Sequence, residues 1–176
     1  MTVKIILTEP NKLLRQISQP VDHVGENEQK LMDDMIETMY AANGIGLAAI
    51  QICFPQRIIL IDLGKDKDQA NKKPMYFVNP VILNKAKEQS TYEEGCLSVP
   101  DQFAEIDRPN KCEIEYLDYN GKKKLLKADG LLATCIQHEI DHLEGILFID
   151  YLSKLKKSMI IKKLSKQKNK FDRIVV

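Results

Sequence analysis

The chain has 176 residues, with 26 Lys and Arg against 25 Asp and Glu, and 44% of its residues are hydrophobic. A chain of this length buries roughly 70% of its unfolded surface, so a core is expected without disulfide cross-links. The composition excludes a disordered chain, and no apolar run approaches the roughly 18 residues that span a bilayer. We therefore expect one domain over residues 1–176, located in the cytoplasm, with its four cysteines as free thiols.

Hydrophobic periodicity predicts a helix and several short strands in the first three quarters of the chain. Apolar residues recur at helical spacing over 28–42, and Asn43-Gly44 follows as a stop signal. Runs rich in β-branched and aromatic residues predict strands at 57–62, 75–83, 111–119 and 122–127. The last two are joined by a hairpin turn at Asn120-Gly121. The polar stretch 64–74 predicts a surface loop.

A second helix is predicted over 130–143, with Asp129 as its N-cap. Strands that are joined by hairpins, with helices segregated from them, indicate an α+β fold. We expect antiparallel sheets packed around this central helix, plus an N-terminal helix and a C-terminal helix.

The segment 150–176 is predicted to be a basic helical extension. It carries nine Lys and Arg against two Asp, net +7, whereas residues 1–149 carry 17 against 23, net −6. Leu152, Leu155 and Met159 recur three and four apart, which indicates one apolar stripe on a Lys-rich helix. Two interpretations stay open: a solvated helix that packs through its stripe, and a helix that docks on an anionic partner such as RNA.

The central helix carries His138-Glu139-Ile140-Asp141-His142. A spacing of four places both imidazoles on one helical face, close enough to bind one cation, and Glu139 lies between them. Two neutral nitrogens suit Zn²⁺ or Fe²⁺, which can activate a water near neutral pH while the carboxylate takes its proton. The pattern therefore predicts a hydrolytic metal site.

The identity of the third metal ligand distinguishes the known classes of hydrolases with two such histidines. Proteases with a third His need it where this chain has Phe148. Proteases with a later Glu are excluded as well, because no Glu follows Glu144, unless Asp150 or Asp172 substitutes.

A cysteine is the remaining candidate for the third ligand, since two His and one thiolate leave one position open for water. Cys96, fixed between a glycine and a proline in an irregular segment, is favoured over Cys135 on the helix itself, but spacing leaves both open. Cys53 and Cys112 are predicted to lie in the core, and His23 at the surface.

Three segments resemble the signatures of the peptide deformylase family. Gly44–Gln51 matches Gly-x-Gly-Leu-Ala-Ala-x-Gln, Glu94–Ser98 matches Glu-Gly-Cys-Leu-Ser, and Gln137–Gly145 matches Gln-His-Glu-x-Asp-His-Leu-x-Gly. The likeness extends from Leu13-Leu14-Arg15 through the tail. The resemblance implies metal-dependent removal of the formyl group from the N-terminal formyl-methionine of new polypeptides, with release of formate.

The resemblance also implies a role for each matching residue. The metal ligands would be Cys96, His138 and His142. Glu139 would move the proton, and the oxyanion would be stabilised by the Gln51 side-chain amide and the Leu97 backbone N–H. The residues that bind substrate would be Gly44 and Gly46, where a side chain would hinder an extended peptide, and the methionine pocket of Ile45, Leu131 and Cys135.

The implied cofactor is one divalent ion, Fe²⁺ in the cell, for which Zn²⁺, Ni²⁺ or Co²⁺ can substitute. The implied partners are the formyl-methionyl nascent peptide and, through the basic tail, the ribosome; neither a membrane nor DNA is expected. This chain has Gln102-Phe103 where several members carry Arg, so Arg108 is the next candidate for that substrate contact. Two other hypotheses are a peptidase with the same ligands and a non-catalytic ribosome-associated module.

Overall fold

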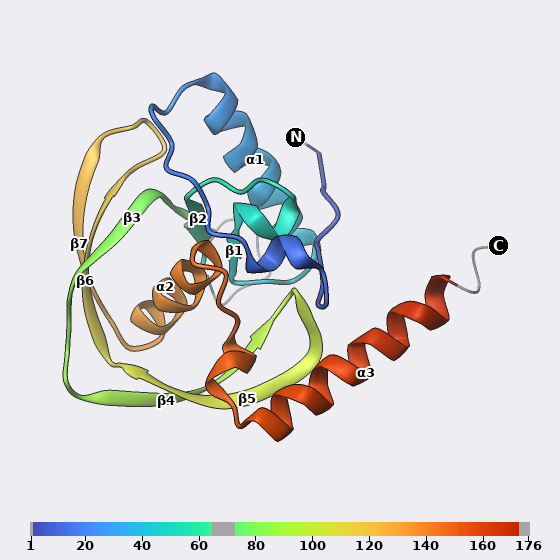
Figure 1. The fold of residues 1–176 in the computed structure, drawn as a ribbon. Coiled ribbons are helices and arrows are strands. Elements are labelled where there is room, and N and C mark those ends of the chain that lie inside the picture. Colours follow the sequence, from blue (N-terminus) through green and yellow to red (C-terminus); the bar gives the residue numbers. More distant parts are fainter. Residues whose placement is uncertain (1, 65–72, 173–176) are drawn as a thin grey trace.

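A five-stranded antiparallel sheet and a two-stranded sheet enclose one helix in the computed structural model, which describes residues 2–64 and 73–172 (Figure 1). The larger sheet has the order β1-β2-β3-β6-β7, and β4 pairs with β5. The strands are β1 Gly46–Ala48, β2 Ile58–Ile61, β3 Met75–Lys85, β4 Gln89–Cys96, β5 Val99–Pro109, β6 Lys111–Leu117 and β7 Lys123–Asp129.

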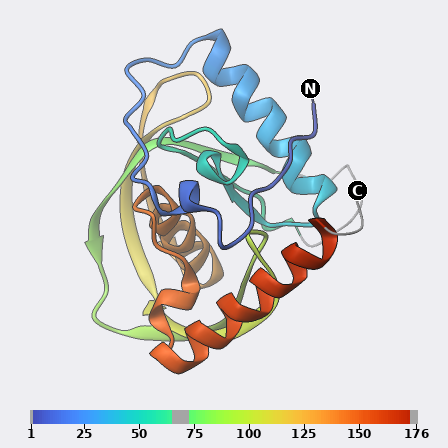
Figure 2. The same cartoon turned by 45° about the vertical axis from the view of Figure 1, so that its right-hand side comes forward.

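Three α-helices occupy different places around these sheets within the described residues. They are α1 Glu26–Ala41, α2 Gly130–Leu143 and α3 Lys154–Asp172, and the short 3-10 helices are η1 Lys12–Arg15, η2 Ala49–Ile52 and η4 Phe148–Tyr151. α2 lies in the middle, inside the curved strands, while α3 runs along the outside beside the β4–β5 pair in both views (Figures 1 and 2). The α+β prediction and the central helix are confirmed.

Strand β2 is buried on both faces and joins two halves of the core. Ile59 and Ile61 pack in the cluster that contains α2, whereas Ile58 and Leu60 pack in the cluster that contains α1. Successive side chains on a strand point to opposite faces, so four consecutive apolar residues serve both clusters. The sheet therefore holds α2 at a fixed position between its inner face and the β4–β5 pair.

The β4–β5 pair was not predicted from the sequence. Its residues are paired from Gln89↔Pro109 to Gly95↔Phe103, and the register shifts between Gly95 and Cys96. The segment around Cys96, which the sequence analysis treats as irregular, is thus the end of a strand at a bulge. The inward-facing Glu94 and Arg108 are charged and the outward-facing Phe103 is apolar, and these residues hide the alternating pattern that identifies a strand.

Helix α3 is confirmed, but its predicted apolar stripe is only partly right: Leu152 packs against the third core cluster, whereas the other two members are exposed. Leu155 and Met159 are 72% and 62% exposed, whereas Leu164 is buried. Leu164 packs with Phe148 of η4 and Val99 of β5 in a third core cluster. The contacts with η4 and β5 rotate the helix so that a different set of apolar residues faces inward.

Several smaller predictions are resolved by the same structure. Asp129 is the N-cap residue of α2, as predicted, but its side chain makes no capping hydrogen bond. Cys53 is exposed rather than in the core, because it ends η2 in the left-handed conformation with φ +71°. Cys112 is buried and His23 is exposed, as predicted.

The predicted loop 64–74 falls mainly on residues 65–72, which lie outside the described residues. Among the helices that are described, none is long and apolar enough to cross a membrane.

Candidate metal centre

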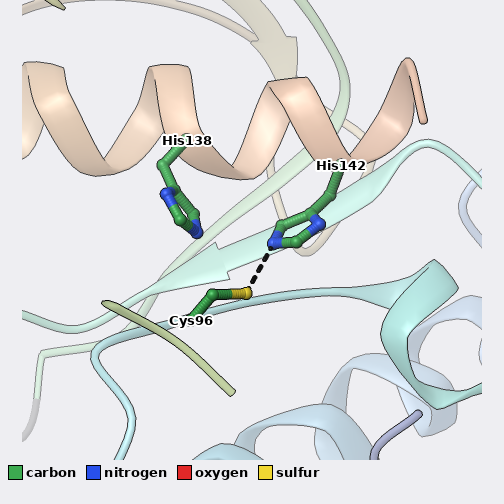
Figure 3. A group of neighbouring side chains, drawn as sticks. All are labelled: Cys96, His138 and His142. Atoms are coloured by element: carbon green, nitrogen blue, oxygen red, sulfur yellow. Dashed lines mark hydrogen bonds between the residues drawn. The ribbon is translucent and has the colours of Figure 1, made fainter. Parts of the chain in front are cut away.

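Helix α2 and the end of strand β4 bring one thiol and two imidazoles together. One ligand atom each of Cys96, His138 and His142 lies within 4.8 Å of the other two. Figure 3 shows both imidazoles projecting from the same side of α2 towards the thiol, and Cys96 Sγ lies 3.2 Å from His142 Nε2. Cys135 is outside this group.

The two candidate cysteines differ in environment as well as position. Burial, and to a smaller extent the nearby Glu139 carboxylate, raise the pKa of the Cys135 thiol to about 12. A thiol must lose its proton to bind a metal, so such a pKa disfavours metal binding. Cys96 instead contacts His142 directly and receives a 3.6 Å contact from the Gln51 amide.

A buried carboxylate orients the first imidazole. His138 Nδ1 lies 2.8 Å from Glu94 Oε2, which leaves the other ring nitrogen for the metal position. Hydrogen bonds of this kind fix the tautomer and the orientation of metal-binding histidines. Glu94 is quoted in a sequence signature, yet the sequence analysis assigns it no role.

Arg108 holds Glu94 in place. Its guanidinium donates to both Glu94 oxygens at 2.5 and 3.1 Å and to Asp141 at 2.7 Å. Asp141 also accepts a 2.8 Å hydrogen bond from Tyr151, whose ring lies under the guanidinium. Arg108 is only 3% exposed, so the expectation that it contacts substrate is wrong: its charge is used within the protein.

The two histidines have opposite pKa shifts. Burial lowers the pKa of His142 well below its usual value, so this ring is neutral, which is the form that binds metals. Burial also acts to lower the pKa of His138, but hydrogen bonds to Cys96 and Glu94 outweigh it and raise the pKa. Metal binding at this position therefore competes with a proton.

Glu139 is buried beside the two histidines. Burial raises the pKa of its carboxyl to about 7, and Oε2 has no hydrogen-bond partner among the described residues. A Cβ at Gly46 would overlap this carboxylate, so glycine is what allows β1 to lie against Glu139. The backbone of β1 thus packs directly against the Glu139 carboxylate of α2.

The Gln51 side chain is fixed by two hydrogen bonds. Its Oε1 accepts from the Ala48 N–H at 2.8 Å, and its Nε2 donates to Ser98 Oγ at 2.9 Å. Because its carbonyl faces Ala48, the amide nitrogen is directed towards Cys96. Leu97 follows Cys96 in the short turn between β4 and β5.

A cavity of about 510 Å³ contains most of the predicted site residues. Its lining includes Ile45, Gly46, Gln51, Cys96, Leu97, Leu131, Cys135, His138 and Glu139. Gly44 and His142 do not line it. His142 is buried below the surface, and a Cβ at Gly44 would lie 2.8 Å from Leu97 Cδ1, so Gly44 permits close packing behind the cavity wall.

Most residues that the sequence did not reveal contact other site residues and are not themselves among the three grouped metal-ligand candidates. Arg108 and Tyr151 carry no motif, and their partners are distant in sequence. Ser98 stands within a quoted signature, and this was the available signal for its contact with Gln51.

The donor set fits a divalent transition metal. Two imidazole nitrogens and one thiolate are common ligands of catalytic zinc and related ions, with a further position left for water. A buried carboxylate of raised pKa on the same cavity is suited to proton transfer. The fold and the site together are those of a metal-dependent hydrolase.

Comparisons with known proteins give the particular family. The family model described as polypeptide deformylase matches residues 3–158. The peptide deformylase of Pelagibacter ubique is 75% identical over 176 residues, the whole of both chains. The crystal structure of the Ehrlichia chaffeensis peptide deformylase in complex with actinonin is 43% identical, with a TM-score of 0.89 over 95% of this chain and 98% of that one. A peptide deformylase from Legionella pneumophila is 42% identical, with a TM-score of 0.88 over 98% and 99%.

This chain belongs to the polypeptide deformylase family. It is a metal-dependent hydrolase that removes the formyl group from N-formyl-methionine at the start of new polypeptides. The resemblance seen in the sequence is thereby confirmed, and the peptidase and non-catalytic hypotheses are set aside.

Proposed function

We propose that Cys96, His138 and His142 hold the metal ion on which deformylation depends. The observation that carries this proposal is the approach of their ligand atoms to within 4.8 Å beside the buried Glu139 carboxylate. Such an ion, when bound, polarises the formyl oxygen and makes water a nucleophile at neutral pH. Glu94 keeps the His138 ring turned towards the ion through its 2.8 Å hydrogen bond.

Glu139 moves the proton in this proposal. Its carboxylate takes a proton from the attacking water and passes it to the leaving nitrogen, which must be protonated because an amide anion is a poor leaving group. The pKa of about 7 supports both directions of transfer, and the unpartnered Oε2 supports its access to the reacting atoms.

Two donors stabilise the negative charge that develops on the formyl oxygen. One is the Gln51 side-chain amide, held by Ala48 and Ser98, and the other is the Leu97 backbone N–H. A fixed donor of this kind typically contributes ~3–4 kcal/mol to the transition state. The hydrogen bonds of Gln51 support this role, because the amide is oriented before substrate binds.

The methionine side chain occupies the apolar end of the cavity. Ile45 and Leu131 are 46% and 40% exposed there, beside the buried Cys135. An exposed apolar surface that lines the same cavity as Glu139 is suited to an unbranched apolar side chain. Gly46 lets the chain approach Glu139, and the role of Gly44 as a substrate contact stays a prediction.

Cys96→Ser tests the ligand assignment, with Cys135→Ser as the matched control. Serine at position 96 should sharply reduce the metal content of the purified protein, whereas serine at position 135 should leave it close to one ion per chain. Metal analysis after dialysis measures both. The opposite result would transfer the third ligand to Cys135.

A paired peptide assay tests the cavity as the site of deformylation. A formyl-methionyl peptide, its unformylated twin and a chelated control are followed by mass spectrometry. We expect metal-dependent loss of the formyl group and no reaction of the twin. Cleavage of an internal bond in the twin would instead assign a peptidase activity to the cavity.

The ion in the cell is proposed to be Fe²⁺, with Zn²⁺, Ni²⁺ and Co²⁺ as substitutes. A thiolate beside an oxidisable ion makes an iron site sensitive to oxygen. Protein prepared without oxygen should therefore contain iron and lose activity in air, and Ni²⁺ or Co²⁺ should restore it. Full activity of an air-exposed zinc form would contradict the iron assignment.

The tail is proposed to contact the ribosome, in the cytoplasm where formylated chains are made. Lys162 and Lys166 are exposed on α3 and lie one turn apart, which supports an electrostatic contact with RNA. Deleting the tail would also remove the buried Leu164, so charge reversal is the cleaner test. Lys162→Glu with Lys166→Glu should weaken salt-dependent binding to ribosomes, and unchanged binding would contradict the contact.

A further inference from the structure

A second groove lies between strand β5 and helix α3. It has a volume of about 580 Å³ and is distinct from the catalytic cavity. Its walls include Phe103 and Glu105 from β5 and Lys156, Met159 and Lys163 from α3. Figures 1 and 2 both show α3 running beside β5 along the outside of the molecule. Nothing in the chemistry of deformylation itself uses this groove.

The groove adjoins the catalytic cavity. Gln102 and Phe103 line both of them. The Phe103 ring lies over Gly95, where a Cβ would be 2.6 Å from the ring, and the side chain is still 66% exposed. The Phe103 side chain therefore lies on the boundary between the catalytic cavity and the groove. A chain leaving the cavity across this boundary enters the groove directly.

The groove combines apolar surface with positive charge. Phe103 and Met159 present exposed apolar side chains, at 66% and 62% exposure. Lys156 and Lys163 are seven residues apart on α3, so they lie two turns apart on the same side of the helix. Neither lysine has an ion-pair partner among the described residues, and Glu105 is the single acid in the lining.

We propose that this groove binds the downstream part of the formylated polypeptide, beyond the residues that occupy the cavity. Apolar side chains of the substrate pack on Phe103 and Met159, and substrate carboxylates pair with Lys156 and Lys163. RNA fits less well, because the floor is apolar and Glu105 would repel phosphate. The inference rests on the proposed placement of formyl-methionine in the adjoining cavity.

Peptides of two lengths test the groove. All begin with formyl-Met-Ala-Ser; one ends there, and two continue to nine residues with either acidic or basic positions six to nine. A nine-residue extended peptide spans about 30 Å, so positions six to nine extend well beyond the three residues that the short peptide shares. The readout is the ratio of kcat/KM for a long peptide to that for the short one, measured with the same protein.

The native protein should prefer the acidic long peptide to the basic one by about two- to tenfold at low salt, as expected for two exposed ion pairs. Lys156→Glu with Lys163→Glu should abolish or invert this preference. Lys154→Glu with Lys162→Glu is the matched control: it makes the same change of charge on the same helix at exposed positions turned roughly 100–180° from Lys156 and Lys163, and it should keep the preference.

Equal kcat/KM ratios for the acidic and basic peptides would overturn the proposal. So would an equal loss of the acidic preference in both double variants, because it would indicate only the overall electrostatic field of the helix. Ribosome binding that is lost with Lys156→Glu and Lys163→Glu, at an unchanged peptide ratio, would assign the groove to RNA instead. Failure of the native protein to deformylate the short peptide would count against the proposed catalytic site, a result separate from all of these.

Discussion

Helices α2 and α3 are both amphipathic, yet their polar side chains lie in opposite environments. α2 is buried along most of its length, and polar side chains such as His138 and Gln137 have defined partners inside the protein. α3 buries one side through Leu164 and leaves most of its lysines in solvent. In the roles proposed above, the chemistry depends on buried polar groups whose partners fix their geometry, whereas recognition depends on exposed groups that have few partners within the protein.

The strongest test of this contrast is the Glu139→Gln substitution on α2. Glutamine has nearly the same shape but cannot accept the proton, so kcat/KM should fall by about 10²–10⁴. Metal content should be unchanged, because Glu139 is not among the three grouped ligands. Steady-state kinetics and metal analysis on one preparation measure both. Near-normal turnover would refute the proton-transfer role.

Removing the cation behind the metal centre should cost stability as well as metal affinity. Arg108→Met leaves the Glu94 and Asp141 carboxylates without their buried partner, which typically costs about 3–5 kcal/mol. Loss of such support behind a ligand typically weakens metal binding about 10- to 100-fold. Urea unfolding and metal competition provide the two measurements.

The control is Lys123→Met, which breaks the exposed pair between Lys123 and Glu115. Exposed pairs contribute little, so this variant should match the native protein in both measurements. Equal effects of the two substitutions would mean that the buried network has no special importance.

Two leucines on α3 distinguish its buried side from its solvent side. Leu164→Ala should lower the free energy of unfolding by about 2–4 kcal/mol, because the side chain is 3% exposed among Phe148 and Val99. Leu155→Ala should change it by less than about 0.5 kcal/mol, since that residue is 72% exposed. Chemical denaturation compares them. The reverse order would restore the stripe that the sequence pattern predicted.

The smallest expected effect concerns Asp150 of η4, whose carboxylate interacts with residues before and after η4. Burial acts to raise the pKa of Asp150, but the Leu147 N–H, Lys157 and Arg15 outweigh it, and the pKa is lowered. A carboxyl with a lowered folded-state pKa stabilises the protein above its unfolded pKa of ~4 and loses this contribution as pH falls through the folded value.

Asp150→Asn should therefore reduce stability at pH 7 by about 1 kcal/mol or less, a value that allows for screening of a partly exposed group. The difference from the native protein should shrink towards pH 3. Thermal unfolding at both pH values measures it. A difference that grows on acidification would contradict the lowered pKa.

The central helix with its two histidines, and four of the strands, could be predicted from the sequence because their signals are local. The four-residue spacing of His138 and His142 fixes their common face whatever surrounds the helix. Strands β2, β3, β6 and β7 were also predicted, with boundaries displaced by a few residues. The turn at Gly121, with φ +74°, follows the Asn-Gly signal directly.

The remaining features depend on partners that are distant in the chain. Glu94 and Arg108 are 14 positions apart, and Arg108 and Asp141 are 33 apart, so no local pattern reveals that network. The side of α3 that is buried is decided by contacts with η4 and β5. Cys53 occurs in an apolar run, but the left-handed turn at that residue directs it outward.

The placement of the grouped ligands on two separate elements has a mechanical consequence. Cys96 belongs to the β4–β5 hairpin and His142 to α2, 46 positions later. An ion bound by both is a reversible cross-link that closes a loop of that length, and a covalent closure of this size restricts the unfolded chain by about 3–5 kcal/mol. In the proposed site the ion would therefore also hold the hairpin against the helix, and a chelator should loosen this contact before it unfolds the five-stranded sheet.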